Sequence, residues 1–114
     1  MLRPFAAFVL LAFLASPLHA HSRKEATVPA DGATVAAVER VEMRFDKPMR
    51  IIAVSLRAAG AAVPLARETG MEPVTTFRAA PEAPLAPGAY MVEWRGMSED
   101  GHPMQGSFGF TVGK

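Results

Sequence analysis

The chain has 114 residues, no cysteine and a formal net charge of +1, which is the size of one small domain. Without cysteine it has neither disulfides nor thiolate metal sites, so the hydrophobic core must hold the fold alone. A charge this close to zero excludes electrostatic capture of DNA, or of an anionic lipid surface, as the main activity.

The first twenty residues have the composition of a secretory signal peptide. Arg3 precedes an apolar run from Phe5 to Leu14, and the segment 15-ASPLHA-20 follows, in which Leu18 is bulkier than the small residue usual three positions before a cut. The run is too short to span a bilayer and the chain turns polar directly after it, which favours removal of the segment over a retained anchor. We expect cleavage after Ala20 and an exported mature chain, residues 21–114, that begins with His21.

Alternation of apolar and polar residues predicts strands throughout the mature chain. Three segments with period-two patterning each place three large apolar side chains on one face: Val41, Met43 and Phe45; Tyr90, Val92 and Trp94; Phe108, Phe110 and Val112. The apolar run 51–57 predicts a more deeply buried strand, and weaker candidates are 23–28, 61–65 and 74–79. Only 33–41 could briefly be helical, and its threonine and valines make it a poor helix former.

Turn signals rich in proline, glycine and aspartate separate these strands at short intervals. They are 29–32, 46–48, 59–60, 69–70, 81–88 and 100–103. Many short strands with frequent turns are typical of antiparallel sandwiches and barrels. The sequence therefore predicts an all-β fold, a small Greek-key β-sandwich or barrel of the immunoglobulin-like kind with about seven strands.

Motifs of common enzymes are missing from the sequence. It has no Gly-x-Ser-x-Gly elbow, no glycine-rich phosphate loop and no His-Glu-x-x-His pair. We therefore expect the protein not to be an enzyme. After removal of the leader only two histidines remain, His21 at the new amino terminus and His102 in the segment 97-MSEDGHPMQG-106.

An amino-terminal histidine can chelate a metal through its α-amine and its imidazole together. Both groups titrate near neutral pH, so a divalent metal displaces their protons at modest cost. The His102 imidazole and the Asp100 carboxylate would raise the set to three nitrogens and one oxygen. Such a set favours tetragonal Cu(II). Residues i and i+2 of an extended segment point to the same side, and Gly101 lets the backbone bend between them.

Each of these residues also has an ordinary explanation. Asp-Gly followed by His-Pro is a good turn sequence that needs no metal, and His21 could be a frayed chain end. The two histidines together argue for the metal, because one occupies the predicted cleavage point and the other belongs to an acidic i+2 pair.

The mature chain resembles the CopC-domain copper resistance proteins, which are small periplasmic β-barrel copper carriers. The resemblance runs from His21-Ser22 through Pro29-Ala-Asp-Gly32 and 41-VEMRFDKPM-49 to 85-LAPGAYMVEWRGMSEDGHPMQGSFGFTV-112. It implies that His21, Asp100 and His102 bind one Cu(II) per mature chain. It further implies a periplasmic monomer in copper resistance or uptake, with an inner-membrane copper transport protein as partner and no polysaccharide substrate.

Two departures from the family pattern concern the metal. Lys47 stands where many relatives have a glutamate close to the Cu(II) site, and a lysine there either raises the cost of the metal's charge or points to solvent. The mature chain also lacks the dense methionine run that holds Cu(I) in some relatives. Met49, Met97 and Met104 are the first candidates for such a site, and gap-filling or scattered methionine is the simpler interpretation.

Two rival functions remain open at the level of the sequence. A copper ion held by a terminal and a second histidine is also the metal core of oxidative polysaccharide-cleaving enzymes. Those enzymes generally need a large flat substrate surface, and a carboxylate in the coordination plane would limit the positions open to oxygen. An immunoglobulin-like interaction module without metal would be supported by the fold class alone.

Overall fold

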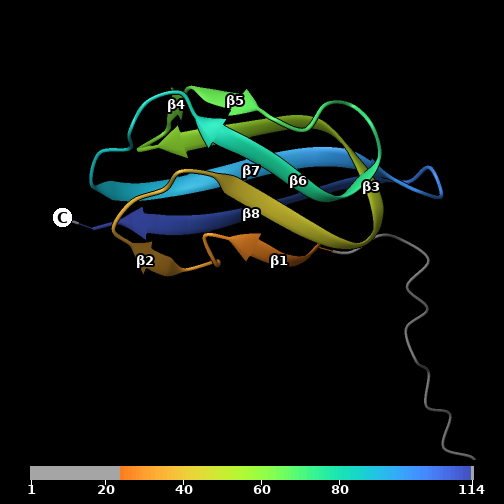
Figure 1. Cartoon of the computed structure of the whole chain (residues 1–114), viewed down its shortest axis with the longest axis horizontal. Helices are drawn as coiled ribbons and strands as arrows, with labels where there is room; N and C mark the ends of the chain where they lie inside the picture. The colour runs from red at the N-terminus through yellow and green to blue at the C-terminus, as the bar shows by residue number, and fades with distance from the viewer. Residues whose placement is uncertain (1–23, 114) are drawn as a thin grey trace, which may run out of the picture.

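A computed structural model describes residues 24–113 and contains strands without helices in that part of the chain (Figure 1). The eight strands are β1 (Lys24–Val28), β2 (Ala33–Val35), β3 (Val41–Ala58), β4 (Ala61–Val63), β5 (Leu65–Arg67), β6 (Val74–Pro81), β7 (Gly88–Ser98) and β8 (Pro103–Val112). The all-β sandwich or barrel is confirmed, with eight strands where about seven were predicted. No helix in residues 24–113 is long and apolar enough to cross a membrane.

The long strand β3 joins the two halves of the fold. The part of β3 before the bend, residues 41–45, pairs with β1 and β6, and the part after the bend, residues 49–57, pairs with β7. The remaining order is β2-β8-β7-β3-β6-β5, with neighbours that are not consecutive in sequence, as in Greek-key folds. A strand that changes partners at a bend is how a sheet turns a corner and closes around a core.

The bend in β3 corrects the prediction for 46–48. The sequence predicted a turn there between two separate strands, but β3 continues through Asp46-Lys47-Pro48. The pairing of β3 with β6 shifts register between Arg44 and Met49, where the irregularity lies. Proline disfavours a regular ladder without ending an extended chain. Met49 then pairs with both Val74 and Ser98, so directly after the bend β3 lies between β6 and β7.

Two further predictions were wrong in detail. Residues 33–35 of the possible helix 33–41 form strand β2, which lies parallel to β8. The run 51–57 is not uniformly buried, because Ile52 is 39% exposed while Ile51 and Leu56 are fully covered. A register shift opposite β7 lies between Ile51 and Ala53 and disturbs the simple alternation.

The core is made of the alternating residues that the sequence placed on one face. All nine large apolar side chains that the period-two patterning placed on one face are buried. Trp94 packs edge-on against Phe45, with ring centroids 5.4 Å apart. Gly106 allows this, since a Cβ there would lie 2.9 Å from the indole Nε1 of Trp94. That buried Nε1 has no hydrogen-bond partner among the described residues.

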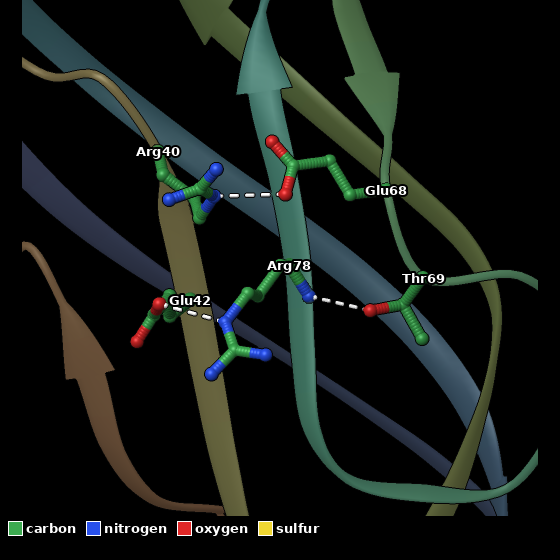
Figure 2. A network of polar contacts seen from close by, with 5 residues as sticks. All are labelled: Arg40, Glu42, Glu68, Thr69 and Arg78. Atoms are coloured by element: carbon green, nitrogen blue, oxygen red, sulfur yellow. Dashed lines mark hydrogen bonds and ion pairs between the residues drawn. The ribbon is translucent and has the colours of Figure 1, made fainter.

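Salt bridges connect the beginning of β3 with its neighbour β6 and with the residue after β5 (Figure 2). Arg40 Nε donates to Glu68 Oε2 at 2.8 Å, and Arg78 Nε donates to Glu42 Oε1 at 2.9 Å. The backbone N–H of Arg78 also donates to Thr69 Oγ1. The hydrogen bond that Arg40 donates to the Glu68 carboxylate raises the pKa of Arg40 above its ordinary value. These exposed pairs fix side-chain positions more than they stabilise the fold.

Arg67 fastens the connection between β5 and β6 to β3. Its Nη2 donates to the carbonyl oxygens of Ile51 at 2.6 Å and Gly70 at 2.8 Å, and its guanidinium lies 5.1 Å from the centroid of the Phe77 ring. Arg50 Nη1 donates to the Met71 carbonyl oxygen in the same connection. The two arginines hold residues 68–73 against the half of β3 that pairs with β7.

We expect Arg67→Lys to lower the free energy of unfolding by about 2 kcal/mol. Lysine keeps the charge but cannot reproduce the planar guanidinium, whose three nitrogens together serve four carbonyl oxygens and which lies over the Phe77 ring. Thermal and urea unfolding of the purified protein would measure the loss. The matched control is Arg95→Lys, since Arg95 is exposed on β7 and we expect a change within about 0.5 kcal/mol. Equal effects at both positions would contradict the anchoring role of Arg67.

Candidate metal centre

The connection between β7 and β8 is a short, well-closed turn at residues 99–102. The backbone N–H of Ser98 donates to the His102 carbonyl oxygen at 2.9 Å, and the N–H of Gly101 donates to the Ser98 carbonyl oxygen at 3.0 Å. Gly101 has a φ of 84°, which side chains rarely adopt and glycine adopts freely. The predicted turn is confirmed, and it lies at the end of the molecule where β3 bends (Figure 1).

This turn brings the side chains of Asp100 and His102 together. His102 Nδ1 lies 3.0 Å from Asp100 Oδ2, and the two side chains are 59% and 32% exposed. Two donors about 2.0–2.1 Å from one metal ion, and at right angles in a tetragonal site, would be about 2.9 Å apart. The pair therefore has the spacing of adjacent ligands, and the same spacing makes a hydrogen bond when Nδ1 carries a proton.

The buried residue Ser98 forms hydrogen bonds with both residues of this pair. Its hydroxyl donates to Asp100 Oδ1, and its Oγ accepts the backbone N–H of His102 at 3.1 Å. Ser98 is 4% exposed and is the buried polar residue of the described chain. The sequence analysis did not single it out. Its position could have done so, because it follows Trp94 by four residues on the inward face of β7.

His21, the third predicted ligand, lies outside the described residues. Within residues 24–113 no group of three or more histidine, cysteine, aspartate or glutamate side chains could hold a metal ion. Asp100 and His102 alone are two donors, so a copper site of four donors needs further ligands.

The structure does not support a ligand role for the other residues that the sequence analysis connected with the metal. Lys47 is exposed on the bend of β3, in agreement with the solvent-facing alternative for this lysine. Met49 is fully buried in the core, as a gap-filling methionine would be. Met97 and Met104 line a shallow surface pocket together with Ile52. The structure therefore does not gather the three methionines at one exposed point.

Comparisons with known proteins agree in sequence and in fold. A family model described as CopC domain matches residues 24–113. Copper resistance protein C of Pseudomonas syringae pv. tomato is 31% identical over 118 residues, which cover 95% of this chain and 90% of that protein. Copper resistance protein C of Escherichia coli is 28% identical over 108 residues, which cover 82% of each chain.

Two solved structures share the architecture. The crystal structure of PcoC, a methionine-rich copper resistance protein from Escherichia coli, superposes with a TM-score of 0.69 at 29% identity, covering 82% of this chain and 99% of that chain. The crystal structure of CopC from Methylosinus trichosporium OB3b gives a TM-score of 0.71 at 25% identity, covering 82% and 94%. The similarity thus spans nearly the whole length of these proteins.

Proposed function

The chain belongs to the CopC domain family, and from that premise we propose that its mature form carries one Cu(II) ion in the periplasm. The ligands are the α-amine and imidazole of His21, the Asp100 carboxylate and the His102 imidazole. The observation that carries the proposal is the 3.0 Å spacing of His102 Nδ1 and Asp100 Oδ2 on an exposed turn. Relatives named as copper resistance proteins support copper as the metal.

The course of β1 supports the participation of His21. β1 is antiparallel to β3, with Lys24 opposite Phe45, so its amino-terminal end faces the half of β3 that contains Met49. Met49 in turn pairs with Ser98, which contacts both Asp100 and His102. Three residues span about 10 Å when extended. A mature chain that starts at His21 is therefore long enough to approach the turn from β1.

A transport role fits an exposed site better than a catalytic one. His102 is 59% exposed, which leaves the metal accessible to a partner that takes it over by exchanging ligands. The partner proposed from the family is an inner-membrane copper transport protein, and the mature chain acts as a monomer. A carboxylate in the coordination plane limits the positions open to oxygen, so oxidative cleavage of a polysaccharide is not favoured.

Titration of the mature protein with Cu(II) tests the proposal. Trp94 is the single tryptophan and lies four residues before Ser98 on β7, about 13 Å along the strand. We expect its fluorescence to be quenched to an end point of one Cu(II) per chain, because a paramagnetic ion at the turn lies within quenching range. Electron paramagnetic resonance should report three nitrogens and one oxygen.

Two results would contradict the proposal. Absence of stoichiometric Cu(II) binding by the mature chain would revive an interaction module without metal. Sustained turnover of ascorbate or peroxide by the copper-loaded protein would favour an oxidative enzyme over a carrier.

A further inference from the structure

Ser98 stands out because it is the one small polar side chain among the buried residues of β7, whose other inward side chains are aromatic, aliphatic or absent. It is 4% exposed, while Trp94 on the same face of β7 belongs to the core. Burying a hydroxyl is unfavourable unless hydrogen bonds compensate for the lost water. The partners of Ser98 therefore indicate why a polar residue is kept there.

All three polar contacts of the Ser98 hydroxyl go to the two residues of the pair on the turn. A serine hydroxyl has one hydrogen to donate, and two acceptors lie within reach, Asp100 Oδ1 and the His102 carbonyl oxygen at 3.2 Å. The hydrogen goes to Asp100 Oδ1, because this acceptor is closer and charged. The Ser98 oxygen accepts the backbone N–H of His102 at 3.1 Å. The His102 carbonyl oxygen is already served by the backbone N–H of Ser98 at 2.9 Å.

These bonds decide which way the Asp100 carboxylate faces. With Oδ1 held by Ser98, Oδ2 is the oxygen that lies 3.0 Å from His102 Nδ1. Rotation of the carboxylate would break a hydrogen bond to a charged acceptor, which is stronger than one between neutral groups. The second bond fixes the backbone of His102 relative to the same hydroxyl, so one side chain sets the relative position of two donors.

We propose that Ser98 is the positioning residue of the copper site, which it prepares by holding Asp100 so that Oδ2 alone is offered to the metal. This inference rests on the proposed function. Ser98 does not touch the metal, and it acts through Asp100 and the His102 backbone. Outer-shell partners of this kind typically change metal affinity 10- to 100-fold when they are removed.

The closure of the turn does not by itself require the bond to Asp100. The backbone bonds from Ser98 N–H to His102 and from Gly101 N–H to Ser98 already close it. A hydroxyl that served only the turn would need no contact with a carboxylate that is one-third exposed. Loss of the hydroxyl should therefore lower the affinity for Cu(II) by more than any change in the free energy of unfolding would explain.

The test compares Ser98→Ala, Ser98→Thr and Ser55→Ala in the full mature chain. We expect Ser98→Ala to weaken Cu(II) binding about 10- to 100-fold and to shift the electron paramagnetic resonance parameters, because Asp100 can turn or bind through both oxygens. Threonine keeps the hydroxyl and should restore most of the affinity and the spectrum. Ser55 lies on β3 opposite Glu93, outside the turn, and its replacement should change neither.

A double-mutant cycle with Asp100→Ala separates positioning from general weakening of the fold. If Ser98 acts through Asp100, Ser98→Ala should cost much less affinity once the carboxylate is gone. Unfolding of the metal-free variants, measured in parallel, shows whether each is folded. Failure of the unmodified mature chain to bind Cu(II) would overturn the proposed function. Normal binding and an unchanged spectrum in Ser98→Ala, or an equal cost in both backgrounds, would overturn only the role of Ser98.

Discussion

Acetylation of the His21 α-amine should weaken Cu(II) binding about 10³-fold. Acetylation turns the α-amine into an amide, whose nitrogen binds a metal only after losing its proton, and leaves no free amine beside the imidazole. The site then loses the chelate formed by two donors of one residue, and joining two binding groups typically raises affinity 10²- to 10⁴-fold. Retention of residues 1–20 should have the same effect. Competition of the protein with a chromogenic Cu(II) chelator measures the change.

The matched control is a single glycine added after Lys114 at the other chain end. It adds a similar mass and leaves the proposed ligands intact, so copper affinity should stay as in the unmodified mature chain. Mass spectrometry of the exported protein must also place its terminus at His21. A terminus elsewhere would remove two of the four proposed donors, and full Cu(II) affinity in such a chain would refute the terminal chelate.

The sequence predicted the core well because period-two alternation reflects burial directly. The three alternating segments needed only one apolar and one solvent-facing side of a strand, and every large residue assigned to the inner side is buried. The path of β3 was harder to predict. Asp46-Lys47-Pro48 is a good turn sequence locally, but pairing of its two flanks with β6 and β7 keeps the chain extended through the bend.

The sequence could predict the part of the site whose residues are close to each other along the chain. Asp100 and His102 are two positions apart with a glycine between them, and the structure brings them to 3.0 Å. Ser98 was missed because its significance depends on burial and on hydrogen bonds made across the turn, and serine is common near turns. His21 stays a prediction, because its role depends on where the leader is removed.

Replacement of His102 by alanine should weaken Cu(II) binding by at least about 10²-fold, beyond the usual effect of losing an outer-shell partner. The backbone N–H and carbonyl oxygen of His102 bond to Ser98, and alanine keeps both. The side chain is 59% exposed, so the free energy of unfolding should change by less than about 0.5 kcal/mol. A loss of affinity without a loss of stability then measures the imidazole itself.

Spectroscopy and a neighbouring substitution complete this test. Electron paramagnetic resonance of His102→Ala should lose the signature of one nitrogen, whereas Asp100→Asn should keep three nitrogens and weaken binding less, since two imidazoles and the amine remain. Glu99→Gln is the matched control, because Glu99 is exposed on the same turn and alternation directs it away from the pair. Unchanged affinity in His102→Ala would place the copper elsewhere. An equal loss in Glu99→Gln would instead indicate that the net charge of the turn, and not a defined ligand set, attracts the metal.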